Sequence, residues 1–226
     1  MVASVKRAIK WRYDSLPKPT KKALDFFSQA TWLEKSKWYL AGGTALTLQV
    51  GNRKSFDLDF FTQQRSFDQN SLLSHFMGNA DWITEVKENG TVYGELFGAK
   101  VSFIANPSFI PKKKIERHGS VRVLNPIDIA VMKLIAASQR GKKRDFFDLY
   151  WCANNLEPLE NTIKRLPDQY PSVAHDYHHI LKSLVYFDDA ENDPDPTIFF
   201  KANWKIVKNY FKKEIPVIAR KLIGLE

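Results

Sequence analysis

Apolar and polar positions divide the chain into a first part rich in strands and a second part rich in helices. Short or alternating apolar runs between turn residues predict strands at about 38–40, 56–61, 82–86, 91–97 and 100–104. Apolar residues that recur every three or four positions predict helices at about 19–35, 44–50, 68–77, 126–140, 144–155, 159–166, 172–187 and 203–223. Strands that precede helices in this way indicate an α+β protein.

Two glycines follow the first predicted strand, and two aspartates lie in the second. Gly42 and Gly43 form a predicted tight turn before the helix at 44–50, where backbone N–H groups suit a phosphate. Asp57 and Asp59 are two positions apart, so a strand points both carboxylates to one face. Together these residues mark a candidate site for chemistry on phosphates.

The paired carboxylates imply a divalent metal. Two acids this close raise each other's pKa unless a cation neutralises them, and such oxygen ligands favour Mg²⁺ or Mn²⁺. The sequence therefore predicts a metal-dependent phosphoryl-transfer site with Asp57 and Asp59 as the metal ligands. The alternative is a strand edge that carries two solvated acids.

The order of these residues carries a family resemblance. Gly42-Gly43 followed by Asp57-Leu58-Asp59 resembles the signature of the DNA polymerase β-like nucleotidyltransferase superfamily. The longer pattern resembles more narrowly the AbiEii/AbiGii nucleotidyltransferase toxins of bacterial type IV toxin–antitoxin systems, and it comprises Leu40–Leu46, Gly51–Ser55 and Asp57–Phe61. A second block is similar to that family's third and fourth motifs, and it comprises Lys133, Arg140 and Arg144–Tyr150.

The resemblance implies a fold and a set of site residues. We expect a polymerase β-like core with a mixed sheet at 1–120, then a mainly helical domain at 121–226 that completes the active site. The residues expected to bind the nucleotide are Gly42, Gly43, Thr44, Arg53, Ser55, Lys133, Arg140 and Asp145. Those expected to take part in catalysis are Asp57, Asp59, Lys133 and Asp148.

Several roles stay open at the level of sequence. Lys133 lies in a strongly apolar helix, so its ammonium group either reaches solvent or has a buried anionic partner. Asp145 and Asp148 orient Lys133 or bind metal; alternatively Asp145 caps its helix and pairs with Arg144 at the surface. Polymerase β-like sites usually have a third carboxylate, and Ser102 occupies the position that suits it. Glu95 or an acid of the second block is the possible substitute.

Composition favours a polyanionic partner. The 226 residues include 34 Lys and Arg against 25 Asp and Glu, which gives a net charge of +9. Such an excess of positive charge suits binding to RNA, DNA or a nucleotide, although net charge affects solubility equally. The basic clusters that flank the site in sequence are Lys112–Lys114 with Arg117, and Lys142–Arg144.

The expected compartment is the cytoplasm. The single Cys152 has no partner for an internal disulfide, the basic N-terminus has no apolar segment typical of a signal peptide, and no apolar run is long enough to span a membrane.

Three further segments invite a functional interpretation, and for the first two we do not favour it. The acidic stretch 188–196 has the spacing of a calcium loop but lacks its glycine and its final Glu, so we expect a solvated connector. His175, His178 and His179 share a helical face, but no second ligand cluster accompanies them, so zinc is not expected. The Pro- and Lys-rich segment 107–120 is predicted to be a loop or linker.

The sequence thus predicts an enzyme that transfers a nucleotide from an NTP to an acceptor. The resemblance implies a toxin that arrests growth, an antitoxin encoded nearby, and an RNA acceptor such as the 3′ end of tRNA. A protein acceptor is the nearest alternative. A protein that binds nucleotide or RNA without catalysis is a second one, favoured by Ser102 in place of a carboxylate.

Overall fold

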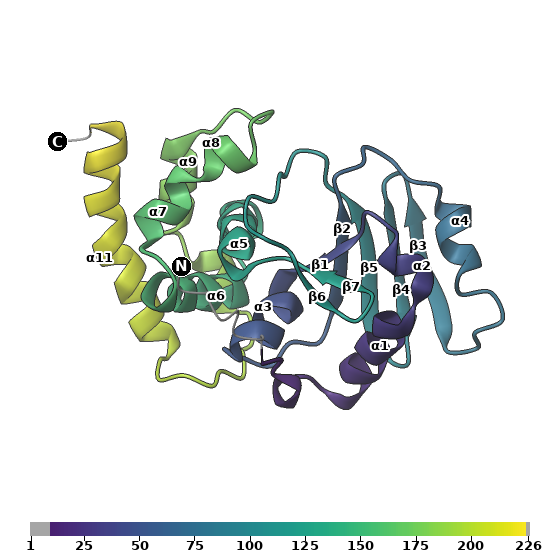
Figure 1. Ribbon diagram of the computed structural model, residues 1–226. Helices are drawn as coiled ribbons and strands as arrows, with labels where there is room; N and C mark the ends of the chain where they lie inside the picture. The colour runs from purple at the N-terminus through teal and green to yellow at the C-terminus, as the bar shows by residue number, and fades with distance from the viewer. Residues whose placement is uncertain (1–9, 225–226) are drawn as a thin grey trace, which may run out of the picture.

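A seven-stranded mixed sheet forms the first half of the protein. The computed structural model describes residues 10–224 (Figure 1). The strand order is β3-β4-β5-β2-β1-β7-β6. The strands are β1 (Tyr39–Ala41), β2 (Leu58–Thr62), β3 (Trp82–Glu88), β4 (Thr91–Leu96), β5 (Ala99–Ala105), β6 (Glu116–His118) and β7 (Val121–Val123).

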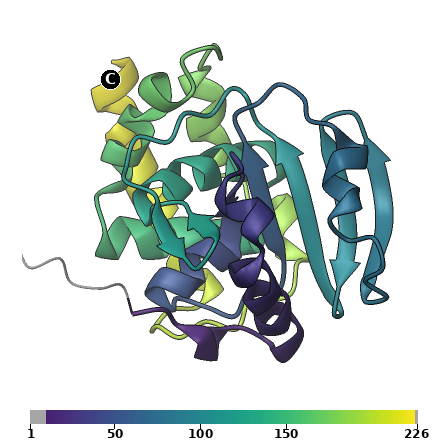
Figure 2. The same ribbon diagram turned by 45° about the vertical axis from the view of Figure 1, so that its right-hand side comes forward.

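Helices fill the second half and also lie between the strands of the first. The early ones are a 3₁₀ turn, η1 (Tyr13–Ser15), then α1 (Lys18–Gln29), α2 (Thr31–Glu34), α3 (Gly42–Val50) and α4 (Gln69–Ser74). The later ones are α5 (Pro126–Arg140), α6 (Lys143–Asn155), α7 (Leu159–Lys164), α8 (Leu166–Gln169), α9 (Tyr177–Ser183), α10 (Asp188–Glu191) and α11 (Trp204–Ile223). In Figure 2 the long strands lie on the right, and most of these later helices, green to yellow, lie on the left.

At the centre of the sheet, β2 and β5 are neighbours although β3 and β4 lie between them in the chain. β2 is antiparallel to β1 and parallel to β5, and β1 is parallel to β7. In the β2–β5 register, Asp59 lies opposite Ser102. Residues that face each other across neighbouring strands point to the same side of the sheet, so these two side chains meet.

Aromatic side chains form the core on the side of the sheet that packs against α1. Phe27 of α1 is fully buried, with its ring 4.8 Å from that of Phe60 and 6.0 Å from that of Phe103. The Phe60 and Phe103 rings stack at 5.0 Å. Because successive strand residues point to opposite faces, burial of Phe60 and Phe103 turns Asp59 and Ser102 to the side of the sheet away from α1.

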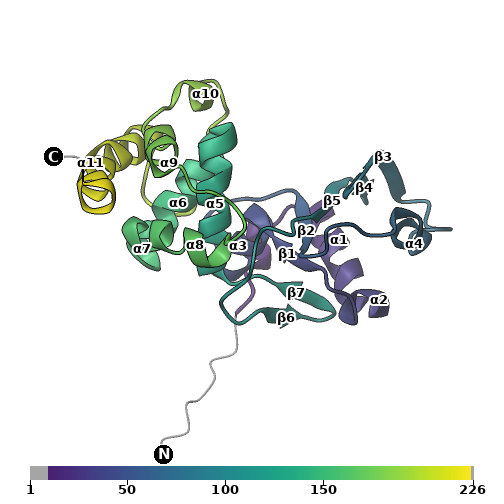
Figure 3. The ribbon, with the colours of Figure 1, turned by 90° about the horizontal axis from the view of Figure 1, so that it is seen from above.

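The helical half packs against that second side. Seen from above, α5 lies next to the sheet and α11 lies furthest from it (Figure 3). Asn125 caps α5 by accepting a hydrogen bond from the Ile127 backbone N–H, and Gly141 ends it in the left-handed region with φ +56°. The fold therefore brings one long helix beside the strand that carries Asp59.

The α+β prediction is confirmed, while several helix boundaries differ from those expected. The helix expected at 19–35 breaks at Ala30, whose ψ of 99° is not helical, and continues as α2. The helix expected at 172–187 shortens to α9 because Asp176 caps it by accepting from the His179 backbone N–H.

The segment 107–120, predicted as a loop, ends in a β-hairpin instead. β6 and β7 pair antiparallel around Gly119, and Val121 and Val123 are fully buried. Gly119 has φ +57°, and a Cβ there would lie 2.3 Å from the Ser28 carbonyl oxygen, so the turn needs glycine. The sheet therefore extends past residue 120, the domain boundary expected from sequence, to Val123.

Within residues 10–224, the helices are all too short or too polar to cross a membrane.

The aromatic core gives a first prediction. Replacing Phe27 with Ala should lower the free energy of unfolding by about 3–5 kcal/mol, because the cavity forms among rings that cannot collapse freely. Phe199→Ala is the matched control, since that ring is 51% exposed and its removal should change stability by less than about 0.5 kcal/mol. Urea denaturation of both variants measures the difference, and equal losses would contradict this description of the core.

Candidate active site

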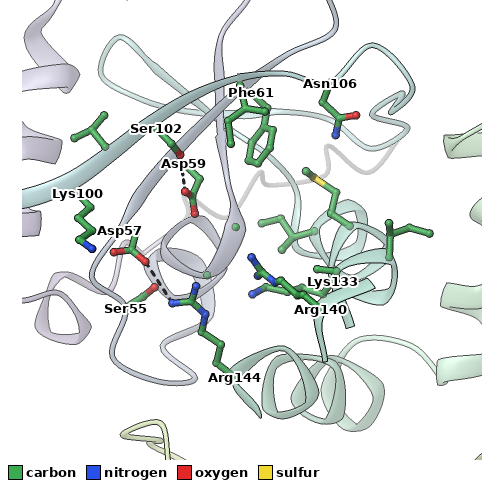
Figure 4. A pocket seen from close by; sticks show the side chains of 18 of the residues that line it. Ser55, Asp57, Asp59, Phe61, Lys100, Ser102, Asn106, Lys133, Arg140 and Arg144 are labelled. Atoms are coloured by element: carbon green, nitrogen blue, oxygen red, sulfur yellow. Dashed lines mark hydrogen bonds and ion pairs between the residues drawn. The ribbon is translucent and has the colours of Figure 1, made fainter. Parts of the chain in front are cut away.

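A cavity of about 480 Å³ lies between the sheet and α5. Strands β2 and β5 form one wall, the start of α3 lies at its base, and α5 with the start of α6 forms the opposite wall. Figure 4 shows Asp57, Asp59 and Lys100 on one side of this space and Lys133, Arg140 and Arg144 reaching toward it from the helices.

The two carboxylates face this cavity. Asp57 immediately precedes β2, rather than lying in the strand as predicted, and Asp59 is the second residue of β2. Asp59 Oδ1 accepts a hydrogen bond from the Ser102 hydroxyl at 2.6 Å. Burial, with the nearby charge of Asp57, raises the pKa of Asp59, although Ser102, Lys133 and Arg144 act against it. The site therefore favours a cation beside Asp59.

The two glycines are required by close contacts. Gly42 has φ +68°, and a Cβ on it would lie 2.6 Å from Asp59 Oδ2. A Cβ on Gly43 would lie 2.3 Å from Arg53 Nη2. Both residues belong to the first turn of α3 rather than to a separate turn, so their N–H groups are among those that a helix leaves unpaired at its N-terminus.

A buried cluster of charges lies behind the cavity wall. Asp148 accepts two hydrogen bonds from Arg53, both at 2.8 Å, and one from the Asn52 amide. Lys133 Nζ lies 2.6 Å from Asp145 and 2.8 Å from Asp148. Asp145 also accepts two hydrogen bonds from Arg140. The sequence left open whether the Lys133 ammonium group reaches solvent or has a buried anionic partner, and the structure shows buried anionic partners.

These contacts hold both aspartates ionised. Burial alone would raise the pKa of Asp148, but Arg53 and Lys133 outweigh it and hold this pKa well below its usual range. Burial would also raise the pKa of Asp145, but Lys133 and Arg140 outweigh burial, so this pKa too lies below its usual value. Each buried carboxylate thus remains paired with two cations.

The structure divides the predicted site residues into two groups. Those that line the cavity are Gly42, Gly43, Arg53, Ser55, Asp57, Asp59, Lys133 and Arg140. Thr44, Asp145 and Asp148 do not line it and are fully buried. The Thr44 hydroxyl donates to the Asp57 carbonyl and forms a second hydrogen bond with the Ser55 hydroxyl, so it fixes the loop before β2. Asp145 does not pair with Arg144, which instead pairs with Asp57 at 3.3 Å.

Sequence reasoning missed several cavity residues. Phe61 continues the two-residue spacing of Asp57 and Asp59 along β2, and this spacing was the available signal. On β5, Lys100, Val101 and Ile104 line the cavity beside Ser102, which the sequence had already indicated, and Asn106 lines it just past the strand. Arg144 was expected only at the surface or along an RNA path, because nothing local places it beside Asp57.

The carboxylates fit a hard divalent cation. Within residues 10–224, no set of three or more His, Cys, Asp or Glu side chains is placed to hold a metal, His175, His178 and His179 included. Mg²⁺, however, commonly takes one or two protein carboxylates and completes its shell with water and substrate phosphates. Asp57 and Asp59 offer that donor set at the cavity wall.

Part of the predicted basic surface is engaged elsewhere. Lys143 is buried and donates to the Asp193 carbonyl at 2.6 Å and to Asp195 at 3.0 Å, and Lys142 pairs with Asp193. The acidic stretch 188–196 therefore anchors the start of α6, rather than forming only a solvated connector. Lys112–Lys114 and Arg117 are exposed.

Comparison with known proteins agrees with this geometry. Residues 28–92 and 100–217 match the family of nucleotidyl transferase AbiEii toxins of type IV toxin–antitoxin systems. An uncharacterized protein of Aquifex aeolicus (strain VF5) is 33% identical over 186 residues, which make up 79% of this chain and 86% of that protein.

Two solved structures have a similar fold. A putative nucleotidyltransferase from H. pylori has a TM-score of 0.54 at 19% identity, with 93% of this chain and 99% of that chain covered. MenT4, a nucleotidyltransferase toxin from Mycobacterium tuberculosis H37Rv, has a TM-score of 0.57 at 13% identity, with 87% and 82% covered. At these identities the likeness shows the fold alone.

Fold and family match together define this protein as a nucleotidyltransferase. Within that class, the chain belongs to the AbiEii nucleotidyl transferase toxin family of type IV toxin–antitoxin systems.

The buried cluster gives a second prediction. Asp148→Asn should lower the free energy of unfolding by about 3–5 kcal/mol, because Arg53 and Lys133 lose the charge that compensates their burial. Asp25→Asn, which breaks an exposed pair with Lys21, should cost at most about 1 kcal/mol. Chemical denaturation at neutral pH compares the two.

The pH dependence of that difference tests the charge directly. Because the folded pKa of Asp148 is depressed, its stabilising effect is present above the unfolded pKa of about 3.9 and is lost as pH falls through the folded pKa. The stability advantage of the wild type over Asp148→Asn should therefore shrink below about pH 4. A difference that stays constant from pH 7 to pH 3 would show that shape, not charge, explains the loss.

Proposed function

We propose that this protein transfers a nucleotide from an NTP to the terminal hydroxyl of an RNA, in a reaction that depends on Mg²⁺ or Mn²⁺. The observation that carries the proposal is the cavity, in which two metal-type carboxylates lie beside a glycine-rich helix start and a group of cations. In the cell the reaction would arrest growth until an antitoxin, which the family implies, opposes it. A cytoplasmic location remains a prediction from the sequence.

The cations suit a triphosphate. Arg140 and Arg144 are about half exposed and line the cavity, so their guanidinium groups are accessible to phosphate oxygens. Lys133 has three N–H donors and gives two of them to Asp145 and Asp148, which leaves one for the cavity. Asp145 and Asp148 would then act as positioning residues that hold Lys133, Arg53 and Arg140.

The proposed step is a substitution at the α-phosphorus. The acceptor hydroxyl oxygen bonds to that phosphorus, the bond to the oxygen that bridges to the β-phosphate breaks, and pyrophosphate leaves while the hydroxyl proton passes to solvent. Asp57 and Asp59 would hold the divalent cation, which neutralises phosphate charge and activates the attacking oxygen when bound. Ser102 orients Asp59 through its 2.6 Å hydrogen bond.

A third prediction concerns Asp59. Replacing it with Asn removes one unit of charge about 4 Å from the cation, worth on the order of 4 kcal/mol per unit of cation charge at an effective dielectric of about 20, or at least roughly a thousandfold in rate. The Asn variant should fold normally, since burial already disfavours the charged form. Transfer of radiolabelled nucleotide to RNA is the measurement, and near wild-type transfer would refute the metal assignment.

Ser102 supports one rival, a protein that binds nucleotide or RNA without catalysis. Under that rival, the wild type binds NTP but transfers nothing, and Ser102→Asp, which restores a third carboxylate opposite Asp59, starts transfer. Our proposal expects transfer by the wild type itself.

A fourth prediction separates an RNA acceptor from a protein acceptor. With about six phosphate contacts, the logarithm of RNA affinity should fall against the logarithm of salt concentration with a slope of roughly −4 to −5. If exposed Lys112 and Lys113 make two of these contacts, replacing both with Ala should reduce the slope by about 2.

Lys164→Ala is the control, because that lysine pairs with Glu160 on α7. The measurement is tRNA binding across a salt series. A flat response, or nucleotide label found only in protein, would favour protein nucleotidylation.

A further inference from the structure

The cavity changes from charged to apolar along its length. β2 and β5 run parallel, and residues at a two-residue spacing along each segment line the cavity, together with Val101 of β5. In chain order these residues are Asp57, Asp59 and Phe61 on one strand, and Lys100, Ser102, Ile104 and Asn106 on the other. Both strands therefore begin at the charged half and end at the apolar half.

Helix α5 repeats the same gradient in the opposite chain direction. Its first half contributes Ile129 and Met132 to the cavity, its middle contributes Lys133, Ile135 and Ala136, and its last turn contributes the polar Gln139 and Arg140. Figure 4 shows Phe61 and Asn106 away from Lys100 and Arg144, on the side opposite the charged groups. The strand wall and the α5 wall therefore both contribute apolar side chains to the same half of the cavity.

Asn106 is the polar side chain that the strands place in the apolar half. Its backbone is fixed, because its N–H donates to the Thr62 carbonyl at 2.8 Å and its carbonyl accepts from Phe109. The Tyr170 side chain lines the same cavity. An amide has two N–H donors and an oxygen with two lone pairs, so the Asn106 carboxamide can both donate to a ligand and accept from it.

The spacing matches a nucleoside. Asn106 lies four residues beyond Ser102, or about 13 Å along an extended strand. A nucleotide whose α-phosphate lies at Asp57 and Asp59 would therefore place its ribose beside Ser102 and Ile104 and its base near Asn106. The Phe61 ring and the Met132 thioether are surfaces on which a planar base packs favourably.

We propose that this apolar half is the subsite for the base of the incoming NTP, and that the Asn106 carboxamide reads the hydrogen-bonding edge of that base. This inference rests on the proposed function. The amide presents a donor beside an acceptor, so it pairs through two hydrogen bonds with base edges that present the complementary arrangement. Asn106 is then a specificity residue, whereas the charged half binds any triphosphate.

Asn106→Asp tests this with little change in shape. A carboxylate accepts only, and guanine presents two neighbouring donors on its pairing edge, so the variant should gain about tenfold in affinity for GTP relative to the other three NTPs. Binding is measured by calorimetry with Mg²⁺ and no acceptor. Asn154→Asp, an exposed change on α6, should leave the ratios unchanged.

A second variant keeps the test valid if Asn106→Asp does not fold. Met132→Trp should fill the apolar half, so NTP binding should fall at least tenfold while binding of inorganic triphosphate stays unchanged. Unaltered NTP binding by Met132→Trp, or unaltered NTP ratios in folded Asn106→Asp, would overturn the subsite.

The same experiments separate the two proposals. If the wild type transfers nucleotide to RNA but neither variant changes NTP selection, the subsite is wrong and the proposed function stands. If Asn106→Asp alters RNA binding instead of the NTP ratios, this half of the cavity belongs to the acceptor, and the subsite is again overturned. A wild type that binds no NTP contradicts both.

Discussion

The pairing of Asp148 with Arg53 is the constraint on which the site depends. It joins α6 to the loop before β2 through two 2.8 Å hydrogen bonds in a fully buried environment. Two charges in such an environment are tolerated only with close partners, so the separation of either residue would be costly. The helical half is thereby held against the strand that carries Asp59.

Other parts of the site follow from this pairing. Arg53 Nη2 occupies the space beside Gly43, so the start of α3 needs a residue without a side chain there. Asp148 also pairs with the Lys133 ammonium group, which pairs with Asp145 as well. One N–H donor of Lys133, at the cavity wall, is therefore not used by these two aspartates. The backbone adds a second tie, since Lys54 donates to Thr197 and Phe199 donates to Asn52. The charged half of the cavity is therefore a product of both halves of the chain.

Local patterns in the sequence predicted the parts of this arrangement that depend on local geometry. The two-residue spacing of Asp57 and Asp59 was enough to predict that both face one site, although Asp57 lies just before the strand, and the spacing of apolar residues was enough to predict α5 and α11. The family resemblance added Lys133, Arg140 and the second block. The direction of Lys133 toward two buried aspartates depends on how α5 and α6 pack, which no local pattern records.

The remaining differences have the same origin. Arg144 reaches Asp57, which is 87 residues away in sequence, and the β2–β5 register that places Ser102 beside Asp59 is likewise long-range. The hairpin of β6 and β7 was missed because its turn depends on a close approach of Gly119 to Ser28 of α1. Asp145 and Asp148 are fully buried, which favours a role in positioning other side chains over direct contact with a substrate.

We propose that the cavity binds an NTP for attack at its α-phosphorus by an RNA hydroxyl, and this mechanism fixes the fate of each phosphate. The most direct measurement incubates the protein with Mg²⁺, RNA and each NTP labelled at either the α- or the γ-phosphate. We expect only the α-label to enter RNA and the γ-label to be released in pyrophosphate. Transfer of the γ-label, or of neither label with any of the four NTPs, would contradict it.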